Sequence, residues 1–135
     1  LLVDRAGVVK ILDLGLVRSE ADKASLLTRQ LDHKGVLGTA DYVAPEQAVD
    51  SSAVDARADI YSLGATLYFL LAGRPLFPDG RTAQKLVWQQ LKEPVPIDRL
   101  RSDVPPALAA VVHRMLQKRP ADRFPTASGV FDALA

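Results

Sequence analysis

The first residues with clear chemical potential are Asp13-Leu14-Gly15, which follow an apolar run that ends at Leu12. A carboxylate offers the oxygen ligands that a hard divalent cation requires. Gly15 allows a sharp backbone turn, which would let the Asp13 side chain point inward. Taken alone, however, an Asp and a Gly after an apolar run favour a simpler interpretation, a turn at the end of a strand.

A second chemically rich segment lies farther along the chain. Residues 38–46 read G-T-A-D-Y-V-A-P-E, so a hydroxyl, a phenol and two carboxylates lie close together in the sequence. By itself this segment predicts a Gly-Thr turn followed by a helix that begins at proline. The order and separation of the two segments carry more information than either segment alone.

Together the two segments resemble the ends of the activation segment of protein kinases, which runs from a D-F-G motif to an A-P-E motif. Residues 38–46 match the family pattern G-T-x-x-Y-x-A-P-E in full, which a turn before a helix does not explain. Asp13-Leu14-Gly15 occupies the D-F-G position, with Leu14 as the apolar residue in place of Phe. The resemblance covers essentially the whole chain and is closest to the bacterial, eukaryotic-like serine/threonine kinases.

The resemblance implies a role for several of these residues in the intact kinase. Asp13 would bind the Mg²⁺ that bridges the ATP phosphates, with Gly15 beside it in the nucleotide site. Thr39 would bond to the Asp and Lys of the catalytic loop and, with Tyr42, form part of the platform for the peptide substrate. The implied cofactors are therefore ATP and Mg²⁺, the implied partners are protein substrates, and the implied acceptor is serine or threonine rather than tyrosine.

Other residues are expected to hold the structure together. In the family, the A-P-E Glu pairs with a distant Arg, and the D-R-F segment at 122–124 places Arg123 at that position as the partner of Glu46. Arg119 is a competing candidate, which we interpret as a solvated charge. Asp59 opens a D-x-x-S-x-G segment, where the family Asp accepts hydrogen bonds from catalytic-loop amides. An Asp favoured by the helix dipole is the alternative interpretation of Asp59, and both can hold at once.

The polar stretch between the two motifs, residues 16–34, predicts a long loop. Phosphorylation orders activation loops through new pairs with arginine. Thr28 is the last hydroxyl before Thr39 and is our first candidate phosphosite, with Ser25 as the second.

Several parts of a complete kinase are absent from the sequence. It contains no glycine-rich phosphate loop, no strand Lys with its Glu partner and no H-R-D-x-x-x-x-N catalytic loop. We therefore assign no catalytic residue within the chain, and expect the catalytic Asp upstream of Leu1, five residues before an Asn that immediately precedes Leu1. Because positioning is nearly all of phosphoryl-transfer catalysis, we predict that the isolated 135 residues are inactive.

Two other classes of protein are alternatives. A pseudokinase, or kinase-like regulatory or binding module, would keep the fold without the chemistry, and the presence of Asp13 and Thr39 argues against it. An unrelated helical interaction domain predicts neither a pair between Glu46 and Arg123 nor a deeply buried helix at 57–72.

The elements that must position these residues follow from the apolar pattern. Residues 1–12 predict a β-hairpin with D-R-A-G as its turn. Residues 57–72 carry apolar side chains on nearly all faces, which predicts a helix buried on all sides that ends at Gly73. Three shorter helices are expected: 81–91, with Leu86, Val87 and Leu91 on one side, a helix capped by Asp103 and ended by Pro120, and a last helix capped by Thr126.

The expected fold is mainly α with a short N-terminal β-hairpin, a truncated protein kinase-like C-lobe whose parent is an α+β two-lobed kinase. We treat residues 1–135 as one partial kinase domain, with the hairpin at 1–12, the activation segment at 13–46 and the helical C-lobe at 47–135. The one Met is Met115, so we interpret the chain as a piece of a longer protein, expected to expose apolar patches when isolated.

Composition excludes several functional classes. A net charge of +1 gives no electrostatic case for nucleic acid as a partner, and the absence of Cys excludes a thiolate nucleophile. The longest apolar stretch, residues 63–73, is too short to span a bilayer. We therefore expect a cytoplasmic chain, whose parent could still carry a membrane anchor elsewhere.

Overall fold

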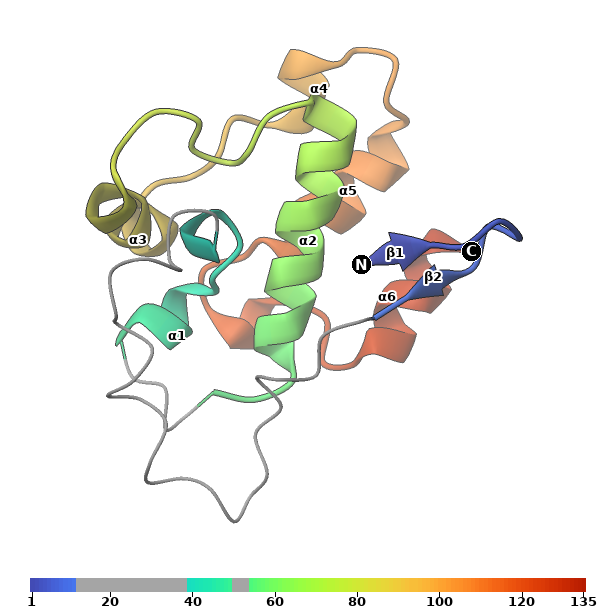
Figure 1. Cartoon of the computed structure of the whole chain (residues 1–135), viewed down its shortest axis with the longest axis horizontal. Coiled ribbons are helices and arrows are strands. Elements are labelled where there is room, and N and C mark those ends of the chain that lie inside the picture. The colour runs from blue at the N-terminus through green and yellow to red at the C-terminus, as the bar shows by residue number, and fades with distance from the viewer. Residues whose placement is uncertain (12–38, 50–53) are drawn as a thin grey trace. The chain divides into compact units, whose positions relative to one another are not determined.

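The computed structural model describes residues 1–11, 39–49 and 54–135, and it is mainly helical with one short two-stranded sheet (Figure 1). The chain divides into two compact units, Leu1–Leu31 and Asp32–Ala135. Four residues singled out from the sequence lie outside the described residues: Asp13, Gly15, Ser25 and Thr28.

The N-terminal unit contains the predicted hairpin. Strand β1 (Leu2–Val3) pairs antiparallel with β2 (Val9–Lys10), with Val3 opposite Val9. The Asp4 carboxylate closes the turn because its Oδ1 accepts hydrogen bonds from the backbone N–H groups of Ala6 and Val8, each at 2.9 Å. Gly7 has φ +81°, a value that favours glycine. The prediction of a turn with Asp at its start and Gly at its end is confirmed.

The second unit is built from helices around one long central helix, α2 (Figure 1). Within the described residues the elements run η2 (Thr39–Asp41), α1 (Pro45–Val49), α2 (Arg57–Ala72), α3 (Thr82–Leu91), α4 (Ile97–Leu100), α5 (Pro106–Met115), η4 (Pro120–Asp122) and α6 (Ala127–Leu134). Helix α2 packs against α5 and α4, and α6 packs against α5. The helix predicted at 57–72 therefore has the predicted bounds.

Helix α2 is buried on one side and bare on another. Tyr61 and Tyr68 are fully buried, and Gly73 ends the helix with φ 70° while its N–H donates to the Phe69 carbonyl at 2.8 Å. Leu63 and Leu70 are 38% and 69% exposed. The prediction that α2 is buried on all sides is therefore wrong for this structure, since no described element of the helical unit covers that face. The exposed leucines agree with the expectation of apolar patches.

The sequence predicts a capping residue at the start of two later helices, α5 and α6. The prediction is wrong for α5 and correct for α6. Helix α5 begins at Pro106 without a side-chain cap, so the predicted cap by Asp103 is wrong. The Arg101 guanidinium instead binds both Asp103 carboxylate oxygens, at 2.8 and 2.7 Å, and lowers the pKa of that carboxyl to about 2. The predicted cap of α6 is confirmed, because Thr126 Oγ1 accepts from the Gly129 N–H at 3.1 Å.

The approach of α2 to α5 depends on Gly64. A Cβ at this position would lie 2.8 Å from the Cβ of Met115, which cannot move without its backbone. Replacing Gly64 with alanine should therefore lower the free energy of unfolding by about 1–3 kcal/mol, as an overpacked core does. Urea unfolding measures this change.

Gly129 is the matched control for that substitution. It lies in α6, and the nearest atom to an added Cβ would be 3.6 Å away, an ordinary contact. Alanine there should raise stability by up to about 1 kcal/mol, because glycine loses more backbone entropy than alanine on entering a helix. The same sign at both positions would contradict the close approach inferred at Gly64.

Candidate functional site

The segment that carries the second sequence motif is fastened to the helical unit. After η2, the Tyr42 carbonyl accepts a hydrogen bond from Ser62 Oγ on α2 at 2.8 Å. Ala44 is fully buried, and its N–H donates to Gln47 Oε1 at 2.9 Å, so the start of α1 is satisfied by a side chain one turn on. The backbone is thus held at Tyr42 by a side chain of α2 and at Ala44 by a side chain of α1. Thr39 is the first residue of η2.

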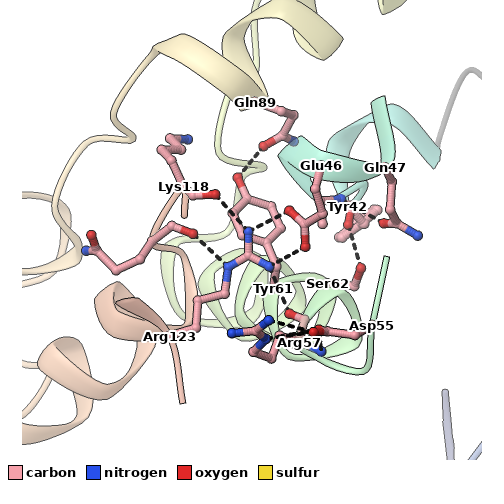
Figure 2. Close-up of polar contacts among 12 residues, drawn as sticks. Tyr42, Glu46, Gln47, Asp55, Arg57, Tyr61, Ser62, Gln89, Lys118 and Arg123 are labelled. Carbon is pink, nitrogen blue, oxygen red and sulfur yellow. Dashed lines mark hydrogen bonds and ion pairs between the residues drawn. The ribbon is translucent and has the colours of Figure 1, made fainter. Parts of the chain in front are cut away.

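Glu46 pairs with a residue 77 positions away, as the sequence predicts. Arg123 Nη1 donates to Glu46 Oε1 at 2.6 Å and Nη2 donates to Oε2 at 2.7 Å, a bidentate arrangement (Figure 2). The Arg123 side chain is 0% exposed and that of Glu46 is 17% exposed. A parallel fork of this kind fixes the relative orientation of the two groups as well as their charge.

The remaining N–H groups of Arg123 are also used. Its Nε donates to the Gln117 carbonyl at 2.7 Å, Nη1 donates to the Arg57 carbonyl at 2.9 Å, and Nη2 donates to the Lys118 carbonyl at 3.0 Å. With the two bonds to Glu46, all five guanidinium N–H groups have an acceptor. Arg123 therefore joins α1, the start of α2 and the segment after α5 at one buried point.

Arg119, the competing candidate for this pair, is solvated. Its Nε lies 3.3 Å from Asp122 Oδ2, in an exposed pair one helical turn apart. Such surface pairs contribute little to stability. The choice of Arg123 over Arg119 is confirmed by the geometry.

Asp59 lies in the first turn of α2 and is exposed. This position suits a carboxylate at the positive end of the helix dipole. The catalytic-loop amides expected to bind it belong to a motif that the sequence does not contain. Its role as an anchor stays a prediction.

The face of α3 toward residues 40–41 is polar, which the sequence did not suggest. Val87 and Leu91, expected on the apolar side, are 50% and 78% exposed, whereas Gln89 is fully buried. Gln89 and Lys85 both reach the backbone or side chain of Asp41. Polar residues four apart on a short helix resemble a solvated face, so the only available signal was their shared i, i+4 spacing.

Lys118 carries a buried ammonium group without a hydrogen-bond partner among the described residues. It lies 5.8 Å from the centre of the Tyr61 ring and 5.5 Å from that of Phe77. Burial lowers the pKa of Lys118 from its usual 10.5 to about 8, an effect that the Glu93 charge opposes and the Arg123 charge reinforces. Between these two values the unfolded chain binds more protons than the folded chain.

Stability should therefore rise as the pH increases from about 8 to about 10.5, relative to a variant in which Lys118 is replaced by methionine. Below pH 8 the difference between the two proteins should stay constant, because Lys118 is then protonated in both states. Urea midpoints at pH 7, 8.5 and 10 for both proteins measure this difference. A difference that does not change over this range would show that Lys118 is hydrated rather than buried.

Among residues 1–11, 39–49 and 54–135, no three His, Asp or Glu side chains lie together as a metal-binding group. Asp13, the predicted Mg²⁺ ligand, is not among these residues. In the same part of the chain, no helix combines the length and the apolar character needed to cross a membrane.

Comparisons with known proteins identify the family of this chain. The family model described as "Protein kinase domain" matches residues 1–133, and the chain belongs to this family. The serine/threonine-protein kinase PknB of Mycolicibacterium smegmatis is 40% identical over 129 residues, which cover 95% of this chain and 20% of that protein. The probable serine/threonine-protein kinase CE0033 of Corynebacterium efficiens is 38% identical over 133 residues, 95% of this chain and 19% of that protein. PknB of Mycobacterium tuberculosis is 37% identical over 129 residues, with the same 95% and 20% coverage. The chain thus spans about a fifth of the length of these curated relatives.

Proposed function

We propose that this chain is the C-lobe part of a serine/threonine protein kinase that transfers the γ-phosphate of ATP to hydroxyl groups of proteins. The observation that carries the proposal is the buried bidentate pair between Glu46 and Arg123. It joins the end of a complete G-T-x-x-Y-x-A-P-E segment to the far end of the chain, and an unrelated helical domain has no reason to contain it.

Each end of the activation segment has its own task in this proposal. Asp13, with Gly15 beside it, would hold Mg²⁺ in the nucleotide site, and the ion would supply positive charge for phosphoryl transfer. Thr39 and Tyr42 belong to the platform for the peptide substrate. We keep the division into a hairpin at 1–12, an activation segment at 13–46 and a helical lobe at 47–135, with Thr28 and then Ser25 as candidate phosphosites.

The chemistry needs groups that this sequence does not contain. A catalytic base, a phosphate-binding loop and a strand Lys are all required to position ATP and the acceptor. We therefore propose that catalysis takes place in a longer protein, called the intact kinase below, in the cytoplasm where ATP is available. The isolated chain should be inactive.

Transfer of labelled γ-phosphate to three peptides that differ only in a serine, threonine or tyrosine acceptor tests the proposal. The intact kinase with Mg-ATP should label the serine and threonine peptides and not the tyrosine peptide. Preference for tyrosine would refute the role assigned to Thr39. Nucleotide binding without any transfer would identify a pseudokinase.

A further inference from the structure

Helix α3 presents two polar side chains, Lys85 and Gln89, to the residues that follow Thr39. They lie one helical turn apart and therefore on the same face. Lys85 Nζ donates to Asp41 Oδ1 at 2.7 Å and to Oδ2 at 3.0 Å, and the two side chains are only 13% and 14% exposed. An ion pair this well covered is screened less by salt than a surface pair.

Gln89 binds the backbone of the same two residues. Its Nε2 donates to the Ala40 carbonyl at 3.1 Å and to the Asp41 carbonyl at 3.0 Å, and the side chain is fully buried. Carbonyl oxygens only accept hydrogen bonds, so the NH₂ group of the amide must face them. The contact therefore does not depend on which side chains residues 40 and 41 carry.

Tyr61 fixes the other end of this amide. Its hydroxyl donates to Gln89 Oε1 (Figure 2), whereas the Nε2 of the same amide donates to the two carbonyls. Burial raises the pKa of the Tyr61 hydroxyl, so it keeps the proton that it donates. Both N–H groups and the oxygen of Gln89 are thus occupied, and the buried amide has one orientation.

Besides the hydrogen bond from Ser62 to the Tyr42 carbonyl, residues 40–46 are attached to the helical unit at each end of the segment. Arg123 holds the Glu46 end through an ion pair. The same guanidinium also donates to backbone carbonyls at the start of α2 and after α5. Gln89 and Lys85 hold the other end through hydrogen bonds to Ala40 and Asp41. Loss of the first attachment affects the whole fold, whereas loss of the second should affect only the residues between Thr39 and Tyr42.

We propose that Gln89, assisted by Lys85, is a positioning residue for the substrate platform. The inference rests on the proposed function, because Thr39 and Tyr42 are the platform residues that flank the two carbonyls. By holding those carbonyls, α3 sets the place of the platform and so the affinity for the peptide, without contact with ATP.

Gln89→Met in the intact kinase tests this inference, with Tyr61→Phe as the matched control. Methionine keeps the length of the side chain but removes both bonds to the loop, as well as the bond to Tyr61. Phenylalanine at 61 removes only the bond between Tyr61 and Gln89. Two lost hydrogen bonds should raise the KM for the peptide roughly tenfold in Gln89→Met, with the KM for ATP unchanged. Tyr61→Phe keeps both bonds to the loop, so it should raise the peptide KM by much less than Gln89→Met does, with the KM for ATP unchanged.

Hydrogen exchange followed by mass spectrometry gives a second readout that needs no activity. Peptides from residues 39–46 should exchange faster in Gln89→Met than in Tyr61→Phe, with α5 and α6 unchanged in both. Equal effects of the two variants, on the peptide KM or on exchange at 39–46, would overturn the inference.

If Gln89→Met does not fold, Lys85→Met decides by the same readouts, since it removes only the ion pair to Asp41. An inactive wild-type kinase would instead refute the proposed function, and exchange would still decide whether Gln89 holds the loop.

Discussion

Replacing Arg123 with methionine should lower the free energy of unfolding by about 3–5 kcal/mol. The substitution leaves the Glu46 carboxylate, only 17% exposed, without its bidentate partner. It also removes the donors to the carbonyls of Arg57, Gln117 and Lys118. Lysine at this position should not restore the loss, because its point charge cannot reproduce the planar fork. Urea unfolding followed by circular dichroism measures the change.

Arg119→Met is the matched control, four positions away in the same segment. Its side chain is 78% exposed and pairs only with Asp122 at the surface. The expected change is within about 0.5 kcal/mol, which is usual for surface substitutions. Similar losses for Arg119→Met and Arg123→Met would mean that the buried pair between Glu46 and Arg123 does not stabilise the fold.

Replacing Asp13 with asparagine in the intact kinase should lower the rate of phosphate transfer by at least about a hundredfold. That is the effect of losing a single preorganised group that stabilises charge in a transition state. Asparagine keeps the size and one oxygen but removes the negative charge that Mg²⁺ requires. The rate should be measured over a range of Mg²⁺ concentrations, because a lost ligand also raises the concentration at which activity saturates.

Asp132→Asn provides the control for Asp13→Asn. Asp132 is exposed in α6, and its replacement removes the same charge without touching the activation segment. Its transfer rate and Mg²⁺ dependence should equal those of the wild-type kinase. A rate for Asp13→Asn within a few fold of that control would exclude Asp13 as the metal ligand.

Local sequence signals predicted much of the fold. The Asp4 turn, the end of α2 at Gly73 and the Thr126 cap each depend on the conformation or hydrogen bonding of one residue and its near neighbours. The Asp103 cap failed for a reason of the same kind. Arg101 lies two residues before Asp103 and donates hydrogen bonds to both of its carboxylate oxygens. Neither oxygen therefore caps the helix.

Long-range contacts were predictable only where a family motif marks them. The pair between Glu46 and Arg123 spans 77 positions, and motif position identified both partners. No motif marks Gln89, and its burial depends on where α3 lies relative to Ala40 and Asp41. The exposed face of α2 could not be predicted for the same reason. An apolar residue such as Leu70 does not indicate which element, if any, covers it.

The central claim is that this chain works as part of an ATP-dependent kinase and not alone. The most direct measurement is the rate of γ-phosphate transfer from Mg-ATP to a serine peptide, compared for the intact kinase, the 135 residues alone and an Asp13→Ala variant of each. We expect that only the intact kinase with Asp13 transfers phosphate. The isolated chain should give no signal above that of its own Asp13→Ala variant. Transfer by the isolated chain well above that variant, or none by the intact kinase, would contradict this account.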